Sequence, residues 1–181
     1  MYPFLRMLKE IVVHSKAVDL PIDGTHISQH IIWPHDLDFW MELNNGRTLT
    51  LYDLGRIPLA RRTGLINALR LKRWGMTVAG SSVRYRRRVT VFQKIEMRSR
   101  ALGWDERFLY VEQSMWRQDG ECCSHALYRM AFTGPNGIVP PKEIAETIGH
   151  QGPSPQLPNW VQTWSAAEGH RPWPPEMSRS S

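Results

Sequence analysis

The fold is decided by residues 33–47, which read WPHDLDFWMELNNGR. Upstream of this stretch, residues 25–33 alternate in polarity with a period of two, which is typical of a strand. Pro34 ends the strand, because it has no N–H to donate to a ladder. Downstream, apolar residues follow helical spacing from residue 45 to about residue 62. Pro58 lies inside this segment and is expected to kink or split the helix, because it removes one internal hydrogen bond.

The loop between the predicted strand and helix carries two aspartates, Asp36 and Asp38. Asn44 and Asn45 are suited to cap the helix, because an Asn side chain accepts hydrogen bonds from free amides of the first turn. This end of a helix has unpaired N–H groups and a partial positive charge. Each aspartate is therefore either a residue that stabilises the helix end or a carboxylate available for chemistry. The residues alone leave both interpretations open.

The rest of the chain predicts one short helix and a meander of strands. Helical spacing covers residues 65–74, and from Met76 the period changes to two. Strands are expected at 94–101, 108–116 and 121–132, joined by turns that contain glycine. A strand, a long helix and then antiparallel strands predict an α+β fold in which the sheet wraps around the helix.

Motifs spread along the chain resemble those of the hotdog-fold thioesterases, the hydroxybenzoyl-coenzyme A thioesterase-like group. The closer resemblance is to a branch of longer, thioesterase-like chains, and it runs roughly from Phe4 to Ile144. It rests on Trp33-Pro34, Asp36-x-Asp38, Asn44-Asn45-Gly46-Arg47, Asp53-Leu54-Gly55-Arg56, Thr63-Gly64-Leu65, Gly103-Trp104-Asp105 and Val139-Pro140-Pro141. The resemblance implies the hotdog fold, an antiparallel β-sheet wrapped around a long central helix. It also implies acyl-coenzyme A thioesterase activity and a homodimer or homotetramer.

The resemblance also assigns roles in the loop. It implies that Asp38 is the catalytic carboxylate and that the backbone N–H of Asn45 polarises the thioester carbonyl. Hydrolysis needs a base or an attacking carboxylate, together with donors for the developing oxyanion. Glu42 stands where the family usually has His, and it is either a second base or a solvated loop acid. Asp53 and Arg56, three residues apart on the helix, are interpreted as a surface ion pair.

Four arginines occur within five residues, at Arg84, Arg86, Arg87 and Arg88. Coenzyme A carries phosphates, and a guanidinium binds phosphate through two parallel hydrogen bonds. These arginines are therefore candidates to hold the nucleotide of an acyl-coenzyme A substrate, and a solvated strand face is the alternative. The net charge of +6 also suits nucleic acid. No recognisable nucleic-acid-binding module accompanies the run, so nucleic acid is not an expected partner.

Neither a metal nor a cofactor is expected apart from the coenzyme A of the substrate, because the seven histidines do not cluster at ligand spacing. The adjacent pair Cys122 and Cys123 implies no disulfide framework, which fits a cytoplasmic protein. The sequence has no run of eighteen apolar residues. Residues 1–15 predict an amphipathic helix that either docks on the protein's own surface or makes peripheral contact with a membrane.

Residues 1–150 are predicted to form the hotdog thioesterase-like domain. Residues 151–181 form an extension rich in Pro and Trp, in which 158–168 is expected to hold a short packed helix, because disordered tails are poor in aromatic residues. The expected function is hydrolysis of a fatty or aromatic acyl thioester of coenzyme A by an aspartate base or nucleophile. The alternative is a non-catalytic protein of the same fold that binds acyl thioesters or acts as a scaffold.

Overall fold

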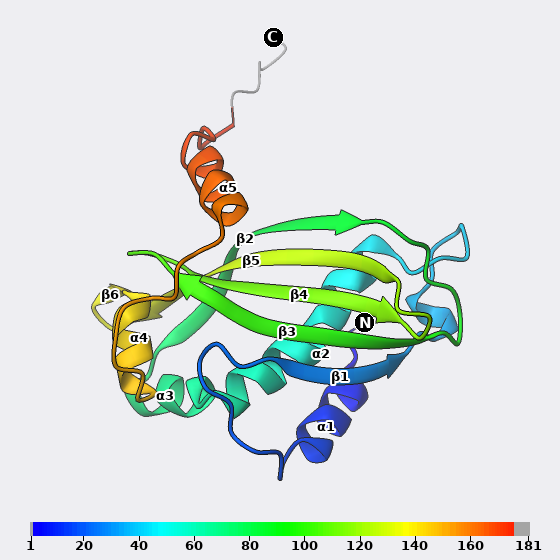
Figure 1. Cartoon of the computed structure of the whole chain (residues 1–181), viewed down its shortest axis with the longest axis horizontal. Coiled ribbons are helices and arrows are strands. Elements are labelled where there is room, and N and C mark those ends of the chain that lie inside the picture. Colours follow the sequence, from blue (N-terminus) through cyan, green and yellow to red (C-terminus); the bar gives the residue numbers. More distant parts are fainter. Residues whose placement is uncertain (1, 176–181) are drawn as a thin grey trace.

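The computed structural model describes residues 2–175 and consists of a curved antiparallel sheet that covers one long helix, α2 (Asn45–Arg62) (Figure 1). The strand order is β1-β3-β4-β5-β2, and β6 pairs with the end of β5. The strands are β1 (His26–Ile31), β2 (Gly75–Tyr85), β3 (Lys94–Trp104), β4 (Leu109–Arg117), β5 (Cys122–Gly134) and β6 (Gly137–Val139). The predicted α+β hotdog architecture is confirmed.

Helix α2 has the limits that the apolar spacing predicts. The Asn44 side chain accepts a hydrogen bond from the Arg47 amide at 3.1 Å, so the predicted cap is present. The helix is continuous through Pro58, and the predicted split does not occur. A proline in a helix interior costs about 3 kcal/mol. Burial of the apolar side chains of α2 against the sheet, such as Leu54 and Leu59, offsets this cost.

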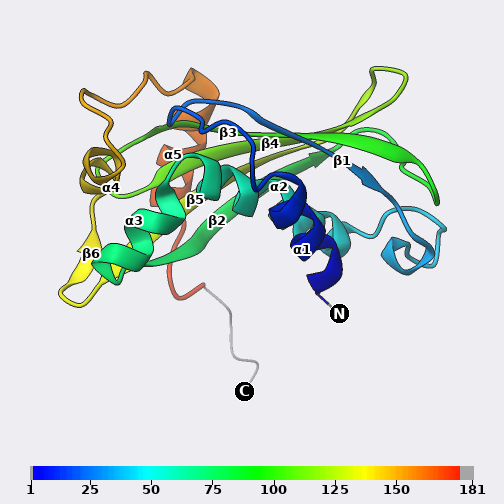
Figure 2. The same cartoon turned by 90° about the horizontal axis from the view of Figure 1, so that it is seen from below.

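The other helices lie around this core. They are α1 (Phe4–Val13), α3 (Leu65–Lys72), α4 (Pro141–Thr147) and α5 (Asn159–Gly169), with a short 3-10 turn, η1 (Pro34–Asp36). Helices α1 and α2 lie on the same face of the sheet (Figure 2). Helix α5 packs on the opposite face, where Val161 is buried with Tyr110 and Leu127. The helix expected in the C-terminal extension is therefore present and packed.

Two short elements were not predicted. The expectation that residues 121–132 form the last strand is wrong, because the turn after β5 folds back into β6. Helix α4 begins at Pro141, a residue suited to a first helical position since its missing N–H would be unpaired there anyway. Both elements are too short for a periodic pattern to stand out in the sequence.

The core lies between α2 and the concave face of the sheet. The inward residues of β3 recur with the predicted period of two, at Ile95, Met97, Ser99 and Ala101. A Cβ at Gly55 would overlap the side chains of Ser99 and Met97, so α2 approaches β3 closely at a position that only glycine fits.

Helix α1 buries one face and exposes the other. Met7 and Glu10 are buried, whereas Phe4, Leu5 and Leu8 are exposed. Its docking on the body of the protein confirms one of the two interpretations of residues 1–15 and leaves the exposed apolar face to be explained. Among residues 2–175, the helices are all too short or too polar to cross a bilayer.

Candidate active site

Asp36 is fully buried and is held by three neighbours. Arg6 on α1 donates to Oδ2 at 2.7 Å, Arg47 on α2 donates to Oδ1 at 3.0 and 2.9 Å, and the Trp33 amide donates to Oδ2 at 3.0 Å. Burial by itself would raise the pKa of Asp36, but the Trp33 amide and the two guanidinium groups outweigh it and lower the pKa. Asp36 therefore joins α1, β1 and α2. Sequence patterns could not reveal this, because 30 residues separate Arg6 from Asp36.

Asp38 is half-buried and lies on a tight turn. Its Oδ1 accepts hydrogen bonds from the amides of Trp40 at 2.8 Å and Glu42 at 3.4 Å. The backbone adds two bonds across the turn, from the Asp38 amide to the Glu42 carbonyl at 2.8 Å and from the Met41 amide to the Asp38 carbonyl at 3.1 Å. Within residues 2–175, the second oxygen, Oδ2, accepts no hydrogen bond from the protein. The turn thus orients the carboxylate and leaves one oxygen available.

An open pocket of about 220 Å³ lies beside the first turn of α2. Glu42, Asn45 and the three arginines from Arg86 to Arg88 all line it. The structure therefore brings together five of the residues that sequence analysis selected. Asp38 lies on the adjoining turn and does not line this pocket, and Arg84 lines a different one with His125 and Trp160.

The guanidinium groups of the arginines that line this pocket remain largely in solvent. Arg88 pairs with Glu42 at 3.1 Å, yet its side chain is 80% exposed. Arg87 pairs with Glu121 at the pocket's outer side, and that pair is also exposed. The backbone beneath is fixed, because the amides of Arg86 and Arg87 both donate to one carbonyl of β5. The pairing of Glu42 with Arg88 favours its interpretation as a loop acid over that of a second base, because its carboxylate already has a partner on the loop surface.

Asp53 and Arg56 do not form a surface pair, which corrects the sequence interpretation. The Arg56 side chain is 11% exposed, donates to Gln113 on β4 at 3.1 Å and lies over the Tyr128 ring on β5 at 4.2 Å. Burial raises the pKa of Asp53 in spite of the opposing charge of Arg56. Spacing on the helix identified the pair, but only the fold places it under the sheet.

A group rich in histidine lies between α1 and β1, although the spacing of the histidines along the sequence shows no cluster. Glu10 of α1 is buried 3.3 Å from His14 and 3.7 Å from His30. His30 also shares a hydrogen bond of 2.8 Å with Ser28. Burial is the main cause that lowers the pKa of His26 to about 4 and that of His30 to about 3. Both histidines are therefore neutral near pH 7.

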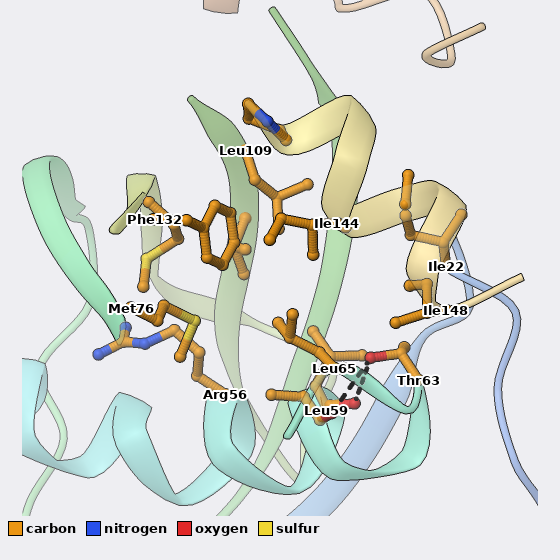
Figure 3. Close-up of a pocket in the computed structure, with 16 residues that line it drawn as sticks. Ile22, Arg56, Leu59, Thr63, Leu65, Met76, Leu109, Phe132, Ile144 and Ile148 are labelled. Carbon is orange, nitrogen blue, oxygen red and sulfur yellow. Dashed lines mark hydrogen bonds between the residues drawn. The ribbon is translucent and has the colours of Figure 1, made fainter. Parts of the chain in front are cut away.

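A second, apolar pocket lies at the other end of α2, between Leu59, Phe132 and Ile144 (Figure 3). Its volume is about 30 Å³, room for about two water molecules rather than for an acyl chain. Leu59 is fourteen residues along α2 from Asn45, which corresponds to roughly 21 Å at 1.5 Å per residue. The two pockets are therefore separate, and the space between α2 and the sheet is too small for an acyl chain at this point.

The family model of the thioesterase-like superfamily matches residues 32–164, which include the aspartate loop, α2 and the whole meander of strands. This chain belongs to the thioesterase-like superfamily. The match begins at residue 32, directly after β1, and continues into α5, so it includes all the candidate residues of both the turn and the pocket.

Individual relatives agree with this membership. Protein THEM6 of Xenopus laevis is 33% identical over 161 residues, covering 87% of this chain and 77% of that protein. The structure is similar to that of YbaW, a probable thioesterase from Escherichia coli, with a TM-score of 0.64, 15% identity and coverage of 68% of this chain and 96% of that one. It is also similar to Slr0204, a 1,4-dihydroxy-2-naphthoyl-CoA thioesterase from Synechocystis, with a TM-score of 0.60, 8% identity and coverage of 69% and 95%. The two solved thioesterase-like structures thus share the fold at low identity.

Proposed function

We propose that this member of the thioesterase-like superfamily hydrolyses an acyl thioester of coenzyme A at the N-terminal end of α2. The observation that carries the proposal is the pocket beside Asn45, which combines a helix N-terminus with exposed arginines. A helix N-terminus offers free amides to a developing oxyanion, and arginines offer partners to phosphates. The similarity to Slr0204, whose own substrate is a coenzyme A thioester, supports the same substrate class.

In the proposed reaction Asp38 acts on the thioester carbonyl carbon through water or directly. As a base, its free Oδ2 takes a proton from water while the water oxygen bonds to that carbon. As a nucleophile, Oδ2 bonds to the carbon and forms an anhydride that water then opens. In either case the C–S bond breaks and coenzyme A leaves as a thiolate that takes up a proton. The amide of Asn45 donates to the carbonyl oxygen as negative charge develops there.

The arginine run completes the proposed substrate site. Arg86, Arg87 and Arg88 line the pocket and hold the phosphates of the nucleotide, whereas Arg84 lies outside it. Neither a metal nor a further cofactor enters the reaction, and nucleic acid is not a partner. Cys122 and Cys123 are both free thiols, which supports a reducing, cytoplasmic location.

The proposed active form is a homodimer or homotetramer. Strand β2 ends the sheet and pairs only with β5 in the part of the chain that the structure describes. A long open edge strand favours pairing with a second copy. Light scattering at micromolar concentration should give at least the mass of a dimer, and a stable monomer would contradict this part of the proposal.

A panel of fatty and aromatic acyl-coenzyme A esters with a readout of free thiol tests the function. We expect catalytic release of free thiol from at least one acyl class, at a rate proportional to the enzyme concentration. If no ester is hydrolysed but calorimetry detects binding, the protein is a non-catalytic acyl-thioester binder. If neither hydrolysis nor binding occurs, the proposal is wrong.

A further inference from the structure

An exposed aromatic turn projects from the end of the molecule where α2 begins. Phe39, Trp40 and Met41 are 89%, 76% and 64% exposed, and we call these three residues the tip. The rings of Phe39 and Trp40 contact each other edge to face, with centroids 5.6 Å apart. Single exposed apolar side chains are ordinary, but three consecutive large ones on one turn form a patch that is typical of an interaction surface.

The tip is held rigidly by its own backbone. The Asp38 carboxylate accepts from the Trp40 amide, and the Met41 amide donates to the Asp38 carbonyl. Met41 has a φ of 58°, a conformation that is uncommon outside glycine. A turn fixed in this way presents its side chains without further ordering, which lowers the entropic cost of binding.

Further exposed apolar side chains lie on the loop before the tip and on α1. Trp33 precedes the tip on the same loop and contacts Phe92 edge to face at 6.0 Å, and both rings are partly exposed. Trp33 also lines an open cavity of about 510 Å³ together with Leu5 of α1 and Lys94. Leu5 is 84% exposed and begins the apolar face of α1 that the fold leaves uncovered.

Positive charge surrounds this apolar surface. Lys9 and Lys94 line the cavity beside Leu5, and Arg86 to Arg88 lie next to the loop through the Arg88–Glu42 pair. Among the acidic groups of this region, Asp36 is buried between two arginines, Glu10 pairs with Lys9 and Glu42 faces Arg88. Asp38, on the turn itself, has no cationic partner among residues 2–175. Exposed Trp and Phe rings flanked by Lys and Arg have the composition of surfaces that bind the interface of a bilayer with anionic lipids.

We propose that this end of the protein docks on the surface of an anionic lipid bilayer. The tip and Leu5 enter the interfacial layer, and Lys9 and Lys94 face the lipid phosphates. The occupant is inferred from the combination of a rigid aromatic turn, an adjoining apolar helix face and a basic rim. This surface is a property of the protein apart from the proposed hydrolysis, and it extends the contact beyond residues 1–15.

Vesicle flotation tests the proposal with two lipid compositions, phosphatidylcholine alone and phosphatidylcholine mixed with phosphatidylserine. We expect the protein to float with the mixed vesicles, more weakly with phosphatidylcholine alone, and less as salt is added. The double variant Phe39→Ser/Trp40→Ser should lower partition into mixed vesicles by about tenfold or more. Trp173→Ser is the matched control, because Trp173 is 91% exposed on the C-terminal extension, and it should leave partition unchanged.

A pair of charge variants tests the basic rim. Lys94→Glu should weaken partition into the mixed vesicles by severalfold, whereas Lys142→Glu on α4, which is also exposed, should not. Circular dichroism confirms that each variant is folded, so that loss of binding is not loss of structure.

Three results would overturn the proposal. They are no flotation of the wild type with either vesicle, equal flotation of wild type and tip variant, and a tip variant that changes oligomeric mass instead of vesicle binding. The third result would make the tip a contact between copies of this chain. Flotation contains no hydrolysis step, so its failure is distinguishable from failure of the proposed activity.

Discussion

Both flanks of the first half of α2 carry charged side chains, but these side chains are buried on one flank and exposed on the other. On the closed flank, α1 and β1 cover the carboxylates of Asp36 and Glu10 together with the neutral His30, and each of these three groups has a partner. On the open flank, Glu42 and the arginines near β2 line a pocket and remain largely in solvent. Charges that are buried and paired hold elements together, whereas charges left in solvent remain available to a ligand.

The aspartate loop connects these flanks. Asp36 lies on the closed flank. Its carboxylate is not available to a ligand, because both of its oxygens accept hydrogen bonds from arginines. Asp38, two residues later, lies on the turn that leads to the open flank, and its Oδ2 accepts no hydrogen bond from the residues that the structure describes. Two aspartates of the same motif thus differ because of what the fold packs against each.

The largest expected effect is the loss of stability in Asp36→Asn. Asparagine at this buried position lacks the negative charge that Asp36 presents to the guanidinium groups of Arg6 and Arg47. We expect the free energy of unfolding to fall by about 3–5 kcal/mol. Urea denaturation measures this change, with Asp38→Asn as the matched control, expected within about 1 kcal/mol of wild type. Equal losses in both variants would remove the distinction between the two aspartates.

A smaller effect concerns the pH dependence of the closed flank. The pKa values of His26 and His30 are about 4 and about 3 in the fold, below the ordinary value of 6.5. The unfolded chain therefore binds more protons, so stability is present above pH 6.5 and is lost as the pH falls from 6.5 towards 4. We expect each of the two histidines to contribute a loss of roughly 2–3 kcal/mol over this range.

Denaturation at several pH values on His30→Asn tests which residues cause this loss. The variant should flatten the dependence, whereas His170→Asn, at an exposed position after α5, should leave it as in wild type. A wild-type stability that does not change between pH 6.5 and 4 would show that the histidines are not held neutral.

The smallest expected effect is on the open flank. Replacing Arg86, Arg87 and Arg88 with Ala should raise KM for the coenzyme A ester by about tenfold, weaken its salt dependence and leave kcat unchanged. The free energy of unfolding of this variant should stay within about 0.5 kcal/mol of the wild-type value, because the three guanidinium groups lie in solvent. Steady-state kinetics measure the change, with Arg70→Ala/Lys72→Ala on α3 as a control of similar charge. If KM is unchanged in the triple variant, the three arginines do not bind the substrate and are a solvated surface.

Local features of the fold were predictable from the sequence because they depend on near neighbours. The limits of α2, its Asn44 cap and the alternation along β3 each follow from residues within one or two turns or one strand. The site was less predictable. Glu42, Asn45 and the arginines meet only because the end of β2 returns to the start of α2, which periodicity along the chain does not indicate.

The failures have physical causes as well. Arg84 lies within β2 and lines an outward-facing pocket with His125. The strand ends at Tyr85, so Arg86 and the arginines after it no longer follow the alternation of the strand and lie apart from Arg84. The environments of Asp36 and Arg56 depend on partners tens of residues away, which spacing along one helix or loop does not reveal.

The central claim, that Asp38 is the reactive carboxylate of the open flank, is tested most directly by kcat of Asp38→Asn on the best substrate of the acyl panel. The amide keeps the shape and can still accept from the turn, but it can neither take a proton nor attack. The account predicts a fall in kcat of about 10²–10⁴-fold with little change in unfolding. Full activity in Asp38→Asn would contradict it, and loss of activity in Glu42→Gln instead would move the reactive carboxylate to Glu42.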